Sequence, residues 1–338
     1  MAWYHTPGYE QDVVIMTGMT LARNLADHPF SARLDALRAR KLPSLIAPVL
    51  LENGFTQIDF SDISRTAAYA IAEKMYVPHA FVRESRPRTL FLNEPCGISV
   101  MVGGEDHFLI RGVCAGLATE DVLSGILAVE RRLDEVVPFA YDDTLGYLTA
   151  SPADLGTGLR ASILLSLPML CTEDAFSSPI RHPTATGQRL TRLDHTPICR
   201  LSAYSAPGLT ESETVDLLDR TARQFLHAER ARRAALAADQ AEEIKDRVLR
   251  TEGLLKSAHL LSAEELPGLL STLRLGAALG LLSDDDGRTR IRVEELTALL
   301  IEAMPAGVSP SASDTPISAT ERNRLRAALV RDRLSVTA

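Results

Sequence analysis

The segment GTGLRAS, residues 156–162, combines two glycines with an arginine close behind them. Glycine lets the backbone approach a ligand closely, and a guanidinium is a planar fork of donors suited to phosphate or carboxylate. Thr157, Gly158 and Arg160 are therefore candidate contacts for an anion. The alternative is that the glycines form a turn before a buried helix over ASILLSLPML, residues 161–170, while Arg160 extends into solvent.

Glu105 follows the pair Gly103-Gly104 and is a candidate general base, provided that a neighbouring group places and tunes it. The glycine pair lies between the apolar runs ISVMV and EDHFLIRGV. It predicts a tight hairpin, because the central residues of the favoured turns need positive φ, and hence a sheet that is at least partly antiparallel. The alternative for Glu105 is a solvated acid beside this turn.

The elements that must position these residues change character along the chain. Strand patterns at Val13-Val14-Ile15 and RTLFLNE alternate with helical stretches near 31–50 and 62–76. From Thr210, which forms a capping box with Glu213, apolar residues keep helical spacing almost to the end. A chain of 338 residues exceeds the roughly 250–300 that one core supports. We therefore expect two domains, 1–238 and 239–338.

Composition narrows the function classes. A net charge of −8 disfavours broad nucleic-acid binding. No apolar run approaches the roughly 18 residues of a membrane span, and the N-terminus lacks the pattern of a secretory signal. The four cysteines show no metal-ligand spacing and are expected to be free thiols. We expect a cytoplasmic protein with no resident metal, no nucleic-acid partner and no membrane contact.

Several segments together resemble the bacterial protein-arginine kinases, which belong to the ATP:guanido phosphotransferases with creatine and arginine kinases. GYLTASPADLGTGLRASILLSLP is close to the signature GYLTSCPxNxGTGLRAS, and LARNLADHPF and EDH support it. KDRVLRTEGLL, LRLGAALGLL and TERNRLRAALVRDRL resemble the protein-arginine kinases specifically. The resemblance covers nearly the whole chain.

The resemblance implies an α+β fold: a catalytic domain with a curved antiparallel sheet flanked by helices, then a small all-α domain. It also implies transfer of the γ-phosphoryl group of MgATP to a guanidinium nitrogen. Such transfer relies on positioning and charge neutralisation, so it needs several arginines around the triphosphate. ATP and Mg²⁺ are the expected cofactors if the protein is active, and none is expected if it is a pseudokinase.

Most of that arginine cage is missing from this sequence. The family's segment SSRIRLARN corresponds to the segment of this chain that begins at Met16, which lacks both phosphate-binding arginines. Of the two adjacent acids in the family's motif NEEDHxR, this chain keeps the second, Glu105, as the candidate base. Four positions have lost the family's nucleotide-binding side chains: Gly18, Thr20, Met75 and Leu109. The first acid has become Gly104, Ser151 replaces a reactive cysteine, and no RGxxGE loop is recognisable between 175 and 198. Only Arg160 is retained.

The rate and binding contributions of the missing arginines are large enough to favour a pseudokinase. One arginine acting on the transition state is worth roughly 10³–10⁵ in rate. Each missing charge-assisted hydrogen bond removes about 1.5–3 kcal/mol of binding, whereas a millimolar ligand has only about 4 kcal/mol in total. The persistence of Glu105, Asp106 and His107 has two explanations, a structural role in the hairpin or residual chemistry.

In the second domain, the resemblance implies a phosphoarginine site on the motif RDxxRA. The matching residues are Arg322, Asn323 and Arg326. Arginines four apart share one face of a helix, and the start of that helix also favours an anion. Asn323 replaces the family's aspartate and carries no charge, so selectivity for phosphoarginine should fall. The alternative is a solvated, arginine-rich helix.

The leading hypothesis is a pseudokinase that binds phosphoarginine-tagged proteins or regulates protein quality control. By family analogy its partners include an unfoldase, a protease and an activator protein. The rival is an active protein-arginine kinase with a rebuilt phosphate site that uses one or more of four other arginines: Arg181, Arg189, Arg192 or Arg200. A third hypothesis is a scaffold that dimerises with an active homologue, and a homodimer is also open.

Overall fold

The computed structural model describes residues 1–171, 188–194, 196–205, 208–283, 290–310 and 317–336. Arg181 lies outside these residues. The fold is built on one eight-stranded sheet with the order β2-β3-β4-β5-β1-β8-β10-β9, in which every neighbouring pair is antiparallel. Its strands are β1 Val14–Arg23, β2 Thr56–Asp59, β3 Thr89–Asn93, β4 Ile98–Val102, β5 Phe108–Ala115, β8 Leu159–Ser166, β9 Arg189–Arg192 and β10 Ile198–Tyr204.

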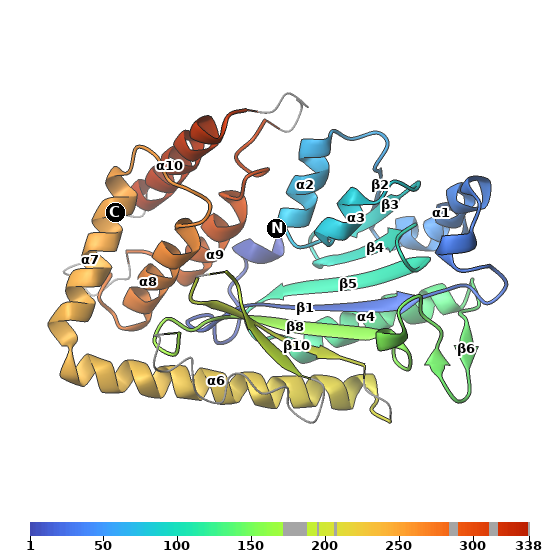
Figure 1. The fold of residues 1–338 in the computed structure, drawn as a ribbon, viewed down its shortest axis with the longest axis horizontal. Coiled ribbons are helices and arrows are strands. Elements are labelled where there is room, and N and C mark those ends of the chain that lie inside the picture. Colours follow the sequence, from blue (N-terminus) through green and yellow to red (C-terminus); the bar gives the residue numbers. More distant parts are fainter. Residues whose placement is uncertain (172–187, 195, 206–207, 284–289, 311–316, 337–338) are drawn as a thin grey trace.

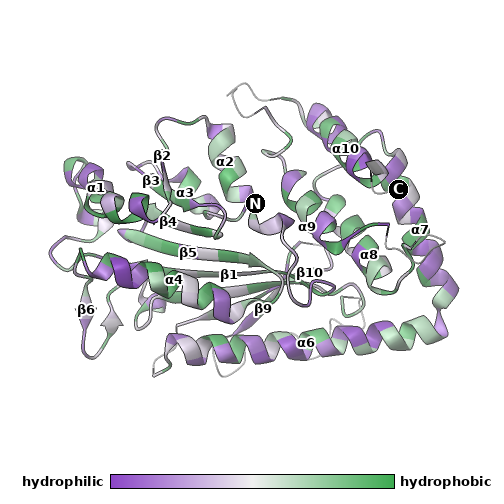
Figure 2. Ribbon diagram, turned by 180° about the vertical axis from the view of Figure 1, so that it is seen from behind, coloured by the Kyte–Doolittle hydropathy of each residue, from purple (hydrophilic) through white to green (hydrophobic). Residues whose placement is uncertain are grey.

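Helices cover one face of the sheet along its length. These are α4, Thr119–Asp134, and α6, Glu211–Asp239, which pack on the central strands (Figure 1). Inward side chains such as Leu21, Ile110 and Ile163 are fully buried against them. In Figure 2 the central strands are largely hydrophobic, whereas α6 alternates polar and hydrophobic residues. This pattern is expected for a helix with one buried face.

Shorter elements surround the other face and the edges. Helices α2, Arg65–Glu73, and α3, His79–Arg83, lie beside the β4–β5 end, and α1 spans Ala36–Glu52. A two-stranded ribbon pairs β6, Tyr141–Asp142, with β7, Gly146–Tyr147. The 3₁₀ helices are η1 Trp3–His5, η2 Ser31–Arg33 and η3 Pro152–Asp154.

Two local predictions from the sequence need correction. The β4–β5 hairpin exists, but Val102 pairs with Phe108, so the connection is longer than a tight two-residue turn. Gly103 has φ +92° and donates to the carbonyl of His107, which lets Asp106 and His107 reach into the protein. The segment after GTG is strand β8 rather than a buried helix, because β1 and β10 both pair with it.

The C-terminal part is helical and packs against the sheet domain. The predicted capping box of Thr210 and Glu213 begins α6. After Gln240 the chain turns into α7, Ala241–Ser257, followed by α8 Leu266–Ala278, α9 Val293–Glu302 and α10 Ala319–Val336. Arg274 on α8 donates to the carbonyl of Gln11, which ties the two parts together. The boundary between 238 and 239 remains a prediction.

The observed architecture confirms the predicted α+β class, with an antiparallel sheet flanked by helices and a helical C-terminal part. In the part of the chain that the structure describes, no helix is long and apolar enough to cross a membrane. Within the same residues the cysteines are free, although Cys171 and Cys199 place their Sγ atoms 3.5 Å apart.

Candidate functional site

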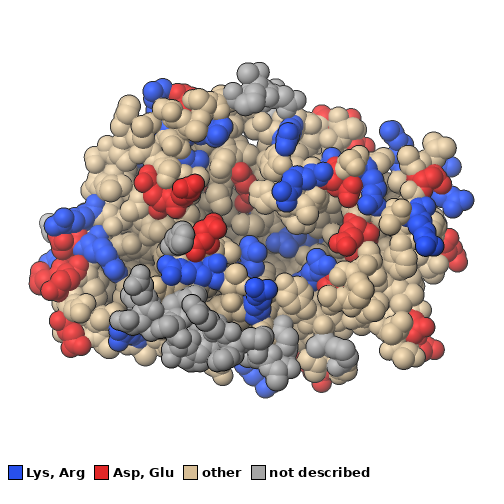
Figure 3. Space-filling model, in the orientation of Figure 1, with Lys and Arg blue, Asp and Glu red and all other residues tan. Residues whose placement is uncertain are grey.

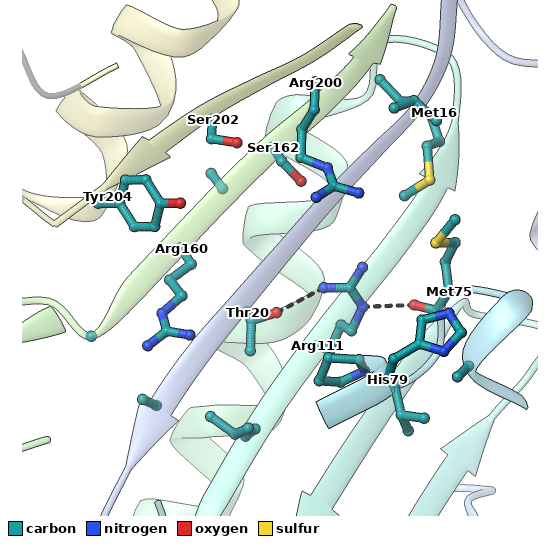
Figure 4. A pocket seen from close by; sticks show the side chains of 18 residues that line it. Met16, Thr20, Met75, His79, Arg111, Arg160, Ser162, Arg200, Ser202 and Tyr204 are labelled. Atoms are coloured by element: carbon teal, nitrogen blue, oxygen red, sulfur yellow. Dashed lines mark hydrogen bonds between the residues drawn. The ribbon is translucent and has the colours of Figure 1, made fainter. Parts of the chain in front are cut away.

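A pocket of about 350 Å³ lies over the sheet face that α4 and α6 leave uncovered. Strands β5, β1, β8 and β10 form its floor, and residues 72–79, from the end of α2 to the start of α3, form a wall. Figure 3 shows a hollow at this place, with basic side chains gathered along its edge. Figure 4 shows the side chains that line it.

Strand register places the lining residues in rows. Thr20 on β1 pairs with Arg111 on β5 and with Arg160 on β8, and Arg160 pairs with Tyr204 on β10. Directly paired residues point to the same face of a sheet, so this row of four crosses the pocket floor. Gly18, Ser162 and Ser202 form the next row, and Met16, Leu164 and Arg200 the one after.

Arg160, the retained arginine, is held by Asp154. Its Nε lies 2.7 Å from Oδ1 of Asp154, and its Nη2 contacts Oδ2, so the ion pair is bidentate. The Asp154 side chain is 1% exposed, whereas that of Arg160 is 47% exposed. The hydrogen bond that Arg160 donates to Asp154 is the largest cause that raises the Arg160 pKa above its usual value. In GYLTSCPxNxGTGLRAS the residue at this position is a neutral Asn. The carboxylate therefore cancels much of the positive charge that Arg160 would offer a ligand.

The glycine loop is fixed by bonds inside the protein. The Thr157 N–H donates to the hydroxyl of Ser205, and the Gly158 N–H donates to the carbonyl of Asp154. Gly158 has φ +66°, and a Cβ there would lie 2.7 Å from the carbonyl oxygen of Ala22. The glycine is thus needed for close packing on β1. Neither of these two amides is left to donate to a phosphate.

The four altered positions surround the pocket. Thr20, Met75 and Leu109 line it, and Gly18 lies in the floor beneath the guanidinium of Arg111. Figure 4 shows Thr20 on the floor, on strand β1, and Met75 at the wall. The replacements predicted from sequence are therefore grouped around one cavity. Their nucleotide-binding significance remains a prediction.

Arg111 is a functional candidate that sequence reasoning missed. Its Nε donates to the carbonyl of Met75 at 2.6 Å, and its Nη1 donates to Oγ1 of Thr20 at 3.0 Å. Burial, and then the charge of Arg200, lower the Arg111 pKa to about 10. Met75 has φ +65°, in the left-handed region just after α2. Arg111 lies two residues after Leu109 on the same strand face, and this spacing was the available signal.

The four arginines of the rebuilt-site hypothesis are differently placed. Arg200 on β10 lines the pocket, where Figure 4 shows its guanidinium turned toward that of Arg111. Arg189 and Arg192 lie on the edge strand β9, and Arg192 donates from Nε to the carbonyl of Thr196. Neither is among the described residues that line the pocket. Arg181 is outside the described residues.

Glu105, the candidate base, is exposed on the β4–β5 connection, close enough to Arg160 for its charge to raise the Arg160 pKa. Its neighbours are structural. The Asp106 carboxylate accepts from the side-chain amide of Asn24 and the N–H of Ala150, and both it and His107 are buried. His107 accepts the N–H of Leu25 at Nδ1, and burial lowers its pKa.

A buried arginine connects these motifs. Arg23, 1% exposed, donates to Glu130 from Nε and to the carbonyl of Thr157 from Nη1, and its guanidinium stacks on the ring of Tyr147. Residues of LARN thus contact both the EDH segment and the glycine loop. The sequence motifs that support the resemblance are largely scaffold, whereas the replaced positions face the pocket.

The candidate phosphoarginine residues lie together on α10. Arg326 is buried and donates to the carbonyls of Ala303 and Leu261 and to Oδ1 of Asn323. Arg322, which is partly buried, donates to the carbonyl of Ile317. Burial is the largest cause that lowers the Arg326 pKa, followed by the charge of Arg322. Arg326 therefore has a structural role, and phosphoarginine binding by this group remains a prediction.

Among the described residues, no group of three or more His, Cys, Asp or Glu side chains could hold a metal ion. The described residues that line the pocket include no Asp or Glu, and Arg160 is paired with Asp154. Whether the pocket accepts a triphosphate remains a prediction.

Comparisons with known proteins place the chain in a family. The family model "ATP:guanido phosphotransferase, C-terminal catalytic domain" matches residues 49–232, and "Protein-arginine kinase McsB C-terminal domain" matches 241–338. The protein-arginine kinase of Desulforamulus reducens is 31% identical over 98% of this chain and 95% of its own length. That of Symbiobacterium thermophilum is 31% identical over 98% and 96%.

Solved structures agree on the fold. Lombricine kinase superposes with a TM-score of 0.56 at 20% identity and covers 67% of this chain and 68% of its own. The duplicated taurocyamine kinase from Schistosoma mansoni with bound transition-state analog components gives 0.57 at 20% identity, over 65% of this chain and 33% of its own. With near full-length matches to protein-arginine kinases and both halves matched by family models, this chain belongs to the protein-arginine kinase family of ATP:guanido phosphotransferases.

Proposed function

We propose that this family member is a pseudokinase with little or no phosphoryl-transfer activity, and that it acts as a binding or regulatory partner of phosphoarginine-tagged proteins. The observation that carries the proposal is the state of Arg160. The one arginine retained from the expected cage is paired bidentately with a buried carboxylate. A paired guanidinium stabilises transition-state charge poorly, because its own counter-ion is already in contact.

The residues that replace the other expected arginines also favour a pseudokinase. Leu109 places an apolar side chain at the pocket wall, and Thr20 places a hydroxyl, where phosphate-binding arginines are expected from the resemblance. Glu105, the candidate base, is exposed to solvent on the β4–β5 connection. Loss of several arginines, at roughly 10³-fold or more each, would reduce transfer below any useful rate.

The binding role concerns α10 and is tested with a phosphoarginine peptide and its unphosphorylated form. Because Arg326 is buried, the informative variants are Arg322→Ala, at a half-buried side chain, and Asn323→Asp, which restores the family's carboxylate. We expect Arg322→Ala to weaken phosphopeptide binding at least fivefold and Asn323→Asp to strengthen it. Equal affinity for both peptides, or no effect of either variant, would refute the binding role.

The partners proposed for this role are an unfoldase, a protease and an activator protein of the quality-control system. Co-purification from the native cell, with Arg322→Ala as comparison, tests them. Recovery of an active homologue as the dominant partner would instead favour the scaffold hypothesis.

A second candidate function is an active kinase with a rebuilt phosphate site. The specific observation in its favour is that Arg200, one of the arginines named for this hypothesis, lines the pocket together with Arg111. Phosphorylation of an arginine-rich protein that disappears in Glu105→Gln would establish this candidate. Absence of a thermal shift with MgATP, together with no phosphoarginine product, would eliminate it.

A further inference from the structure

Arg111 and Arg200 form a cation pair at a place distinct from Arg160. Arg111 rises from β5 and Arg200 from β10, and β1 and β8 lie between these strands. Figure 4 shows the two guanidinium groups turned toward each other over β1, with Arg160 set apart on the far side of Thr20. Burial is the main cause that lowers the Arg111 pKa, and the charge of Arg200 lowers it further. Two guanidinium groups that face each other repel, and an anion between them would relieve that repulsion.

No carboxylate of the described residues relieves that repulsion. Arg111 bonds only neutral oxygens, those of Met75 and Thr20, and among the described residues Arg200 has no hydrogen bond or ion pair. Elsewhere in the same part of the chain, buried arginines such as Arg23 and Arg233 contact Glu or Asp. Arg274 and Arg326 likewise donate only to neutral oxygens, but they lie in the helical C-terminal part, whereas Arg111 lines the pocket and faces a second arginine.

The pocket of about 350 Å³ that both arginines line has room for a compact anion. Directly above Gly18 the space is already filled, because a Cβ at this position would be 3.4 Å from Nη2 of Arg111 and 3.0 Å from the methyl group of Met16. The hydroxyls of Ser162 and Ser202 occupy the same row of the floor as Gly18. Nε and Nη1 of Arg111 are bonded to Met75 and Thr20, and the Ser162 hydroxyl donates to the carbonyl of Gly18. Nη2 of Arg111, the Arg200 guanidinium and the Ser202 hydroxyl therefore supply the donors for the oxygens of one phosphoryl group.

The remaining wall is apolar. Met16, Leu164, Met75 and Val77 line the pocket beside the arginine pair, and no Asp or Glu is among the described lining residues. An apolar wall suits the organic part of a phosphomonoester. It is a poor environment for the cationic guanidinium of a phosphoarginine, which would enter beside two arginines without a counter-ion.

We propose that Arg111 and Arg200 clamp a single terminal phosphoryl dianion in the pocket between their guanidinium groups, and that the ligand is a phosphomonoester or free phosphate. The family's extended triphosphate cage is thereby replaced by a compact subsite for one phosphoryl group, displaced from Arg160 along the strands toward the row of Met16, Leu164 and Arg200. This inference does not require that phosphoryl transfer be absent. A transfer assay tests the proposed function, whereas the titration below tests only the clamp.

The experiment titrates the full-length protein with inorganic phosphate, adenosine monophosphate and free phosphoarginine by calorimetry. The decisive variant is Arg200→Gln, because this exposed side chain makes no hydrogen bond with described residues and its loss should not affect folding. The matched control is Arg189→Gln, an exposed arginine on the neighbouring strand, paired with Ser202. Arg111→Lys provides a second test that retains the charge but removes the fork.

We expect saturable binding of phosphate and adenosine monophosphate that falls at least tenfold in Arg200→Gln and is unchanged in Arg189→Gln. If adenosine monophosphate binds more tightly than phosphate, the ligand class is a phosphomonoester, and if the two bind equally, the ligand is phosphate. Both results support the clamp. Undetectable binding of both probes, unchanged affinity in Arg200→Gln, or a preference for phosphoarginine would overturn the inference. Weaker binding by Arg111→Lys supports it, and unchanged binding there counts against it.

Discussion

Replacing Asp154 by Asn should increase the affinity of the pocket for nucleotide phosphate. The Asp154 carboxylate is 2.7 Å from Nε of Arg160, so it competes directly with any phosphate for the same guanidinium. The substitution removes one buried negative charge and keeps the size and one acceptor oxygen of the side chain. It also returns this position to the residue found in the family signature.

The expected gain in nucleotide affinity follows from Coulomb's law. A phosphate on the outer edge of the Arg160 guanidinium would lie roughly 6 Å from the carboxylate, where two unit charges repel by about 3 kcal/mol at an effective dielectric constant of 20. Because the Arg160 side chain is 47% exposed, we discount this value by half for solvent and salt. The remaining ~1.4 kcal/mol corresponds to about tenfold in the dissociation constant for MgATP or MgADP.

The assay is calorimetric titration of the wild type and Asp154→Asn with MgADP and MgATP at low and physiological salt. The matched control is Asp246→Asn, which removes the carboxylate from an exposed Arg–Asp pair with Arg250 on α7, remote from the pocket. We expect about tenfold tighter nucleotide binding for Asp154→Asn, reduced at higher salt, and no change for the control. A folded Asp154→Asn protein with unchanged affinity would refute the idea that Asp154 neutralises the retained arginine.

Three further predictions concern the scaffold. Burial lowers the His107 pKa, so the neutral imidazole contributes stability that is present above about pH 6.5 and is lost as pH falls toward the folded-state pKa. Denaturant titrations between pH 7.5 and 5.5 should therefore show a steeper loss of unfolding free energy for the wild type than for His107→Gln, and parallel curves would contradict this. Arg326→Gln should reduce the free energy of unfolding by about 3 kcal/mol because it leaves two buried carbonyls without their donor, whereas Arg322→Gln should cost less than about 1 kcal/mol; equal losses would show that Arg326 is not structural. Glu130→Gln should lower the free energy of unfolding by about 3 kcal/mol because it leaves the buried charge of Arg23 uncompensated, and a change below 1 kcal/mol, as measured by chemical denaturation, would argue against this ion pair.

Much of the fold could be predicted because several signals were local. The glycine pair before Glu105 predicted a hairpin, and the capping box at Thr210 predicted the start of α6. The length of the hairpin connection could not be predicted, because it depends on bonds from Asp106 and His107 to residues about 80 positions earlier in the chain. Strand β8 was ambiguous because a short apolar run fits a buried strand or a buried helix equally well.

The candidate site was predictable only in part. Family motifs pointed to Arg160 and to four altered positions, and all of these gather at one pocket. The pairing of Arg160 with Asp154 and the contribution of Arg111 depend on strand register and on the turn at η3. Arg111 could be inferred as a pocket residue from its position two residues after Leu109 only once the face to which Leu109 points on its strand is known.

The most direct test of the central claim is phosphoryl transfer itself. The purified chain and the 31% identical protein-arginine kinase of Desulforamulus reducens are incubated with MgATP and an arginine-rich protein, and phosphoarginine is quantified by mass spectrometry under identical conditions. The account predicts a rate at least about 10³-fold below that of the relative, and no loss of the residual signal in Arg160→Gln, because that guanidinium is already neutralised. A rate within tenfold of the relative, abolished by Arg160→Gln, would contradict it.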